Sequence, residues 1–172
     1  MNIVLIGYRG TGKTSVGMVL AKKLNRTLVE VDAEIVKKAG MSIPEIVKKN
    51  GWDHFRDLES QAIEELKDKE GLIIDTGGGI ILRESNISNL KKNGKIFWLK
   101  ASVPTIINRI KDDTNRPSLT SKSFTEEVED VLKERLPKYK KAAQYIIDTE
   151  NKGIEEIADE ILNIIEKESS PE

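Results

Sequence analysis

Residues 7–14 read GYRGTGKT and match the pattern G-x-x-x-x-G-K-[ST], which constrains the fold more than any other part of the chain. An apolar run at residues 2–6 precedes the motif, and apolar residues at helical spacing follow it from Lys13. In such a strand-turn-helix unit, glycines let consecutive backbone N–H groups turn inward around phosphate oxygens, and the helix N-terminus adds positive potential. The sequence therefore predicts a phosphate-binding loop that holds a nucleoside triphosphate.

The side chains of the motif have separate tasks. Lys13 supplies a mobile charge for the β- and γ-phosphates, and the Thr14 hydroxyl is a ligand for Mg²⁺. The nucleotide-binding residues predicted from this motif are Gly10, Thr11, Gly12, Lys13, Thr14 and Ser15.

Composition excludes several classes of protein. A chain of 172 residues with 38% apolar residues and a formal charge of -1 is typical of one globular domain and gives no reason to expect nucleic-acid binding. No run approaches the roughly 18 apolar residues of a membrane span, and the opening residues lack a leader pattern, so we expect a cytoplasmic protein. The absence of cysteine and the lone His54 argue against disulfides, thiolate catalysis and a histidine-based metal site.

Strand and helix patterns alternate along the chain. Strands are expected at residues 2–6, 27–31, 72–76, 95–99 and 145–148. Helices are expected from Lys13, through residues 35–47 with breaks near Gly40 and Pro44, and at residues 53–69, 103–111, 125–143 and from 154. This alternation predicts one three-layer α/β domain over residues 1–168, with a central five-stranded parallel sheet and helices on both faces, and a tail at residues 169–172. Such sheets bind ligands at the carboxyl ends of their strands.

Charged residues and glycines cluster near those predicted strand ends. Glu30 and Asp32 stand one residue apart, so in an extended chain their side chains point in opposite directions and can do different tasks. Arg56 and Glu59 lie at i, i+3 of a predicted helix and can pair. Three further features complete the pattern: a second cradle of backbone N–H groups at Gly77, Gly78 and Gly79, a polar loop at residues 112–123 carrying Arg116-Pro117, and the run Arg135-Leu136-Pro137-Lys138-Tyr139.

The order P-loop, E/D-x-D, F-R-x-x-E, GGG, R-P-x-L and R-x-P-x-Y resembles the shikimate kinase family from the P-loop to about Asp148. The resemblance implies a P-loop kinase fold similar to nucleoside monophosphate kinases. It also implies that ATP and Mg²⁺ are the cofactors. The implied reaction transfers the γ-phosphoryl group of ATP to the 3-hydroxyl of shikimate, giving shikimate 3-phosphate and ADP in aromatic amino acid biosynthesis.

The resemblance also implies roles for the acceptor-binding residues. Asp32 would hold the shikimate hydroxyls and position or deprotonate the acceptor, while Arg56 and Arg135 would grip the carboxylate. Trp52 lies close to Arg56 in the sequence and would border this pocket. The substrate-binding segment would span about residues 32–60, with further backbone contacts from Gly77, Gly78 and Gly79.

At the nucleotide, the resemblance implies that Arg116 closes onto the transferring phosphate from a lid at about residues 112–124. Arg109 would lie against adenine. Glu30 stands where the family usually has an aspartate that helps hold Mg²⁺, and its longer side chain would act directly or through water. Asp75 stands where the family commonly has a small residue. Because its carboxylate lies at a strand end like a Walker-B aspartate, we expect Asp75 to share the Mg²⁺ shell with Thr14.

Other functions remain open from the sequence alone. The chain has no N-K-x-D motif, which argues against a GTPase. A gluconate-type kinase of the same fold is one alternative, and a nucleotide-binding module that has lost phosphoryl transfer is another. We expect a monomer that acts on a small molecule, without nucleic-acid or membrane partners.

Overall fold

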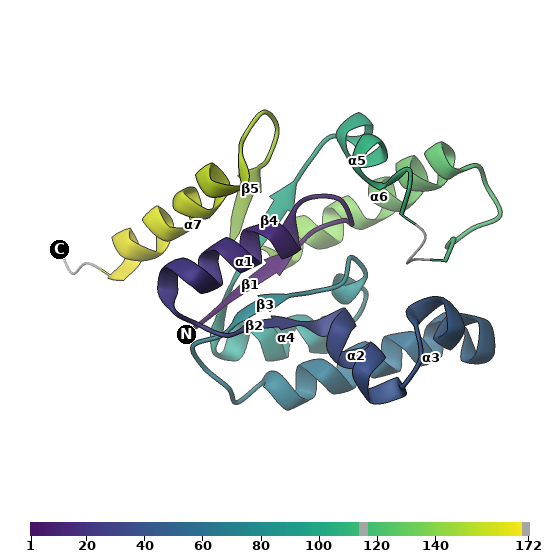
Figure 1. Ribbon diagram of the computed structural model, residues 1–172, viewed down its shortest axis with the longest axis horizontal. Helices are drawn as coiled ribbons and strands as arrows, with labels where there is room; N and C mark the ends of the chain where they lie inside the picture. Colours follow the sequence, from purple (N-terminus) through teal and green to yellow (C-terminus); the bar gives the residue numbers. More distant parts are fainter. Residues whose placement is uncertain (114–116, 170–172) are drawn as a thin grey trace.

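Five parallel strands form the centre of the molecule in the order β2-β3-β1-β4-β5 (Figure 1). The computed structural model describes residues 1–113 and 117–169. The strands within these residues are β1 (Asn2–Ile6), β2 (Leu28–Glu30), β3 (Ile73–Asp75), β4 (Gly94–Lys100) and β5 (Tyr145–Asp148). The predicted five-stranded parallel sheet is confirmed.

Helices connect the strands in the described part of the chain. They are α1 (Lys13–Leu24), α2 (Val31–Ala39), α3 (Ile43–Leu66), α4 (Glu84–Lys92), α5 (Val103–Ile110), α6 (Phe124–Ala142) and α7 (Ile154–Ser169), with a 3-10 turn, η1 (Ile80–Leu82). The sequence pattern predicts neither η1 nor α4. The predicted second strand was too long, because Val31 already begins α2, and the predicted tail began too early, because α7 includes Ser169.

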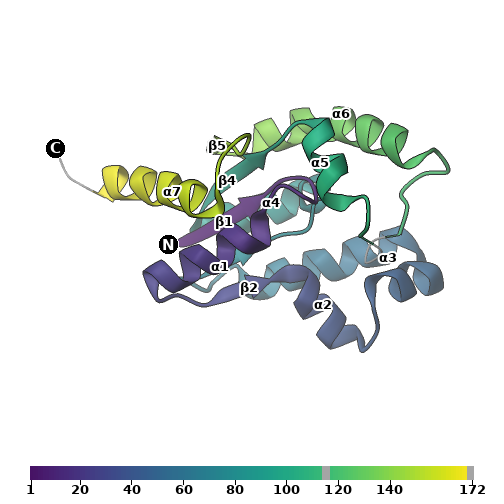
Figure 2. The ribbon, with the colours of Figure 1, turned by 45° about the horizontal axis from the view of Figure 1, so that its top comes forward.

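Alternate side chains of β1 enter two separate cores. Val4 and Ile6 belong to a cluster shared with α3, α4 and α6, whereas Ile3 and Leu5 belong to a cluster shared with α1 and α7. All five residues of β1 are buried, as a strand covered on both faces requires. The predicted placement of helices on both faces of the sheet is therefore confirmed (Figure 1 and Figure 2).

Local signals set the limits of α2 and α3. Gly40 follows α2 with a φ of 67°, and Ser42 caps α3. Pro44 lies in the first turn of α3, where its missing N–H is tolerated, so it does not break the helix as predicted. Gly51, with φ 84° and ψ 171°, kinks α3. The helix beyond the kink corresponds to the one predicted over residues 53–69, but it ends at Leu66, earlier than predicted.

The strand register brings the phosphate-binding loop and two carboxylates to one edge of the sheet. Glu30 of β2 is the register partner of Asp75 of β3, and Asp75 is the partner of Leu5 of β1. Since β1 leads directly into the loop, these groups meet at the carboxyl ends of the strands. No helix in the described ranges has both the length and the apolar content needed to cross a bilayer.

Candidate active site

Glycine conformations shape the loop between β1 and α1. Gly7, Gly10 and Gly12 have φ angles of 147°, 80° and 93°, which side chains disfavour. A Cβ atom on Gly7 would lie 2.6 Å from the carbonyl oxygen of Leu99. Inside the loop, the hydroxyl of Thr11 donates to the carbonyl oxygen of Tyr8 at 2.8 Å. These contacts hold the loop in a turn between the strand and the helix.

Lys13 begins α1 and turns its ammonium group back over this loop. Its Nζ donates to the carbonyl oxygens of Gly7 and Tyr8 at 2.9 and 3.0 Å, and the side chain is only 8% exposed. The N-terminus of α1 contributes positive potential to the same place. The combination of a fixed cation, loop N–H groups and a helix N-terminus suits a phosphate group.

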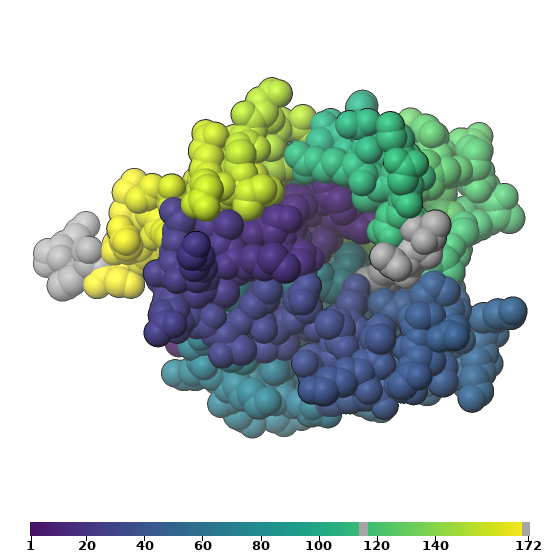
Figure 3. All heavy atoms as spheres, in the orientation of Figure 1, coloured from purple at the N-terminus to yellow at the C-terminus, as the bar shows by residue number. Residues whose placement is uncertain are grey.

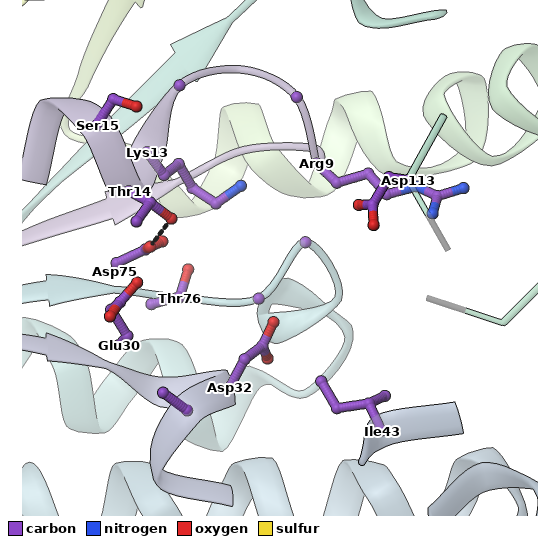
Figure 4. A pocket seen from close by; sticks show the side chains of 15 residues that line it. Arg9, Lys13, Thr14, Ser15, Glu30, Asp32, Ile43, Asp75, Thr76 and Asp113 are labelled. Atoms are coloured by element: carbon purple, nitrogen blue, oxygen red, sulfur yellow. Dashed lines mark hydrogen bonds between the residues drawn. The ribbon is translucent and has the colours of Figure 1, made fainter. Parts of the chain in front are cut away.

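Three carboxylates approach Lys13 and Thr14 from neighbouring elements (Figure 4). The Thr14 hydroxyl donates to Oδ2 of Asp75 at 2.5 Å. Burial raises the pKa of Asp75, while the Lys13 ammonium and the Thr14 hydroxyl work to lower it. Glu30 ends β2 and Asp32 lies in the first turn of α2, so the chain is not extended between them and both side chains line the same cavity.

These oxygen atoms form a donor set that suits Mg²⁺. In the part of the chain that the structure describes, no three His, Cys, Asp or Glu side chains gather as a complete metal site. Mg²⁺ needs no such cage, because it typically takes one or two carboxylates and fills its shell with phosphate oxygens and water. Thr14 and Asp75, joined by their hydrogen bond, are the residues best placed to hold it beside a bound phosphate.

We name the cavity bounded by these groups the P-loop pocket. Its volume is about 490 Å³, within the range of small-molecule sites. The space-filling view shows a hollow between α5 and the α2–α3 region, with the N-terminal chain at its floor (Figure 3). The predicted residues that line the P-loop pocket are Gly10, Gly12, Lys13, Thr14, Ser15, Glu30, Asp32, Asp75, Gly77 and Gly78.

A smaller cavity, which we name the arginine pocket, adjoins the first. Its volume is about 40 Å³, and Arg9 and Gly78 line both cavities. The remaining lining residues are Tyr8, Trp52, Arg56, Gly79, Pro117, Leu119 and Arg135. Three arginines, Arg9, Arg56 and Arg135, therefore line one small cavity, which suits a carboxylate because arginine binds this group through paired hydrogen bonds.

Contacts on three sides hold Arg56 in the arginine pocket. It forms an ion pair with Glu59, which is 1% exposed, as the i, i+3 spacing predicts. Its guanidinium carbon lies 5.1 Å from the centroid of the Trp52 ring, a cation–π distance. A Cβ atom on Gly79 would overlap the guanidinium, so this position has room only for glycine while Arg56 stays in place.

Arg135 reaches the arginine pocket from α6 and is only 7% exposed. One turn later, the hydroxyl of Tyr139 donates to the carbonyl oxygen of Gly78 at 2.5 Å. Burial raises the pKa of Tyr139 to about 12, so the hydroxyl keeps its proton at neutral pH. Tyr139 therefore ties α6 to the glycine segment that separates the two pockets.

Two predicted site residues within the described structure, Thr11 and Arg109, line neither pocket. Thr11 is buried beneath the loop. Arg109, exposed near the end of α5, donates from Nη1 to the carbonyl oxygen of Gly10 at 3.0 Å, which places it beside the P-loop pocket. Arg116 lies outside the described residues, and its expected role remains a prediction.

Sequence reasoning missed several lining residues. Arg9 occupies a variable position of the motif, and its charge at the centre of a phosphate-binding loop was an available signal. Pro117 and Leu119 belong to the quoted R-P-x-L motif, but they had no predicted role. Tyr139 lines neither pocket and likewise belonged to a quoted motif without a predicted role. The sequence analysis singled out none of the other missed lining residues, which are Tyr8, Ala33, Ile43, Thr76 and Asp113.

The comparisons with known proteins show the family of this chain. A family model described as shikimate kinase matches residues 9–166. The shikimate kinase of Thermodesulfovibrio yellowstonii is 46% identical over 169 residues, which cover 98% of this chain and 97% of the relative. The solved structure of shikimate kinase from Acinetobacter baumannii in complex with shikimate has a TM-score of 0.94 at 36% identity, covering 99% of this chain and 95% of that one. Shikimate kinase from Aquifex aeolicus has a TM-score of 0.85 at 34% identity, covering 98% of each chain.

Proposed function

This chain belongs to the shikimate kinase family, and we propose on that premise that it transfers the γ-phosphoryl group of ATP to the 3-hydroxyl of shikimate. The observation that carries the proposal is the pairing of two adjoining pockets. One is built for phosphates around Lys13, and the other presents Arg56 and Arg135. A kinase with a small anionic acceptor needs both.

We place the acceptor across the boundary between the pockets. The arginine pocket is too small for a whole ring, so it takes the carboxylate, which Arg56 and Arg135 bind. The rest of the acceptor then extends past Gly78 into the P-loop pocket, where Asp32 lines the cavity and would hold its hydroxyls. This arrangement directs the hydroxyl end of the acceptor toward the phosphates.

Phosphoryl transfer depends on positioning and charge neutralisation more than on covalent catalysis. In this proposal Lys13 and the N–H groups of residues 10–15 hold the phosphates of ATP. Asp32 holds the acceptor hydroxyl and takes its proton as the hydroxyl oxygen bonds to the γ-phosphorus and ADP leaves. Residues 112–124 act as a lid that excludes water, which would otherwise hydrolyse ATP.

We assign Mg²⁺ to Thr14 and Asp75, with Glu30 contributing directly or through water. The support is the hydrogen bond between Thr14 and Asp75 and the position of Glu30 beside Asp75 in the sheet. When bound, the ion neutralises charge on the β- and γ-phosphates. Asp75 keeps the Thr14 hydroxyl oriented toward that position.

We further propose one catalytic domain over residues 1–168 that acts as a monomer. The described residues of both pockets come from a single chain, so no second copy is needed to complete them. Light scattering after size-exclusion chromatography would test this, and a dimer at assay concentrations would contradict it.

A coupled assay of ADP release tests the function. Shikimate should stimulate ADP release strongly in the presence of ATP and Mg²⁺, and gluconate should not. Stimulation by gluconate alone would favour the gluconate-type alternative. ATP binding without release of ADP with either acceptor would favour a nucleotide-binding module without transferase activity.

A further inference from the structure

Glu127, near the start of α6, is a buried carboxylate that the proposed reaction does not use. It is 3% exposed, and it belongs to neither the P-loop pocket nor the arginine pocket. Its partners come from a segment that precedes α6. Burying a carboxylate is costly unless hydrogen bonds compensate, so such a group requires a physical explanation.

Four donors from residues 118–120 meet at this carboxylate. The hydroxyl of Ser118 donates to Oε2 of Glu127. The Leu119 N–H donates to Oε1 at 3.1 Å, and the N–H and hydroxyl of Thr120 each donate to Oε2 at 3.1 Å. An ionised carboxylate has about four acceptor sites across its two oxygens and no proton to obstruct a donor. Three of the donors converge on Oε2 and one reaches Oε1.

The ionisation of Glu127 fits this arrangement. Burial works to raise the pKa of Glu127, but the hydrogen bonds from Ser118, Leu119 and Thr120 outweigh it and leave the pKa lowered. The carboxylate is therefore charged at neutral pH, and each hydrogen bond to it is charge-assisted.

The segment held by Glu127 is also a wall of the arginine pocket. Pro117 and Leu119 line that pocket together with Arg56 and Arg135. Leu119 additionally packs against the larger hydrophobic core. The position of this wall thus depends on a group in α6 that does not line the pocket.

A general contribution to helix stability does not account for these contacts. Ser123 and Glu126 already form the capping box of α6. Glu129, two residues beyond Glu127, is exposed, whereas Glu127 turns inward to the segment. The hydrogen bonds that Glu127 accepts from Ser118, Leu119 and Thr120 therefore hold residues 118–120 rather than the start of α6.

We propose that Glu127 is a positioning residue that holds residues 117–120 as a wall of the arginine pocket and so sets the affinity for the acceptor. This inference rests on the proposed function, because it concerns the acceptor of the same reaction. The proposal predicts that a change at Glu127 alters KM for the acceptor and leaves KM for ATP nearly unchanged. The reason is that residues 117–120 border the arginine pocket and not the backbone N–H groups of the P-loop.

The test compares Glu127→Gln with Glu129→Gln, which removes the same charge from an exposed position of the same helix. We expect Glu127→Gln to raise KM for shikimate about tenfold while KM for ATP stays within about twofold, as expected for losing charge-assisted hydrogen bonds. Amide exchange at Leu119 and Thr120 in the ligand-free protein should accelerate about tenfold or more. Glu129→Gln should match the wild type in all three measurements.

A second variant keeps Glu127 and removes hydrogen-bond donors from residues 118–120. Ser118→Ala combined with Thr120→Val removes two donors without altering α6, so it tests the proposal even if Glu127→Gln fails to fold. We expect KM for shikimate to rise about threefold to tenfold. Ser121→Ala, at an exposed neighbouring hydroxyl, is the matched control.

Three results would overturn the inference: unchanged exchange at Leu119 and Thr120, an unchanged KM for shikimate, or an equal rise in both KM values. If the proposed function itself were wrong, the wild-type chain would release no shikimate-dependent ADP, and this result distinguishes the two cases. Amide exchange needs no activity, so in that case it would still decide whether Glu127 holds the segment.

Discussion

The P-loop and the arginine pocket are neighbouring parts of one site, but contacts of different range hold them. In the P-loop, hydrogen bonds join residues three to six positions apart, from Thr11 to Tyr8 and from Lys13 to Gly7 and Tyr8. The arginine pocket joins Tyr8 and Arg9 of the P-loop to residues from α3, the glycines after β3, the segment before α6, and α6 itself. One motif encodes the first, while the second exists only when the whole chain is packed.

This difference predicts different responses to mutation. A change in the P-loop alters the group that binds the phosphates and should abolish turnover whatever the acceptor. A change in the arginine pocket should leave ATP binding intact and act on the acceptor alone. Kinetic constants for the two substrates, measured separately, can therefore test whether the two regions are independent.

The largest effect is expected from Lys13→Met. It removes the ammonium group that lies over the loop and would neutralise phosphate charge, so kcat/KM for ATP should fall about 1000-fold. Lys22→Met, at an exposed position of α1, is the control and should leave ADP release unchanged. A Lys13→Met protein that folds and retains more than a tenth of wild-type turnover would contradict the assignment.

Arg135→Ala should have the next largest effect. Loss of one buried guanidinium from the arginine pocket should raise KM for shikimate about 100-fold and leave KM for ATP nearly unchanged. Arg83→Ala is the matched control, because Arg83 pairs with Asp57 away from both pockets. Equal increases in both KM values would show that the two pockets do not act separately.

Gly79→Ala should have the smallest effect of the three. The added methyl group would displace the Arg56 guanidinium from its place beside Glu59, and KM for shikimate should rise about tenfold. The melting temperature should fall as well, because moving Arg56 weakens its ion pair with Glu59, a carboxylate that is only 1% exposed. Gly153→Ala, where nothing lies within 4 Å of the new methyl group, is the control. An unchanged KM for shikimate would mean that the position of Arg56 does not matter.

Much of the fold was predictable because hydrophobic patterns report burial directly. The continuous apolar run at residues 2–6 predicted a strand, and the structure confirms it as β1, with all its residues buried. Helix α4 was missed because only Ile87 and Leu90 are apolar in it, too few to reveal a helical period. The end of β2 was misplaced because its length depends on pairing with β3, over Leu28–Glu30 only, which local sequence does not encode.

The site residues also differ in how well the sequence predicts their contacts, because contacts between residues close in the sequence were predictable and long-range contacts were not. The P-loop residues and the Arg56–Glu59 pair follow spacings along the chain, so local geometry was enough to predict that they lie together. The approach of Tyr139 to Gly78 spans 61 residues, and no local pattern encodes it. The functional roles of these residues remain predictions until the variants are measured.

The sequence by itself determined a phosphate-binding loop on a parallel α/β sheet, because the glycine spacing and the apolar periods act over a few residues. Only the tertiary structure decided how that loop meets an acceptor pocket. It placed Asp32 in a helical turn facing the same cavity as Glu30, and it buried Glu127 against residues 118–120. The physical reason is that such contacts form only after the helices have packed on both faces of the sheet, where buried charges must find partners from distant segments.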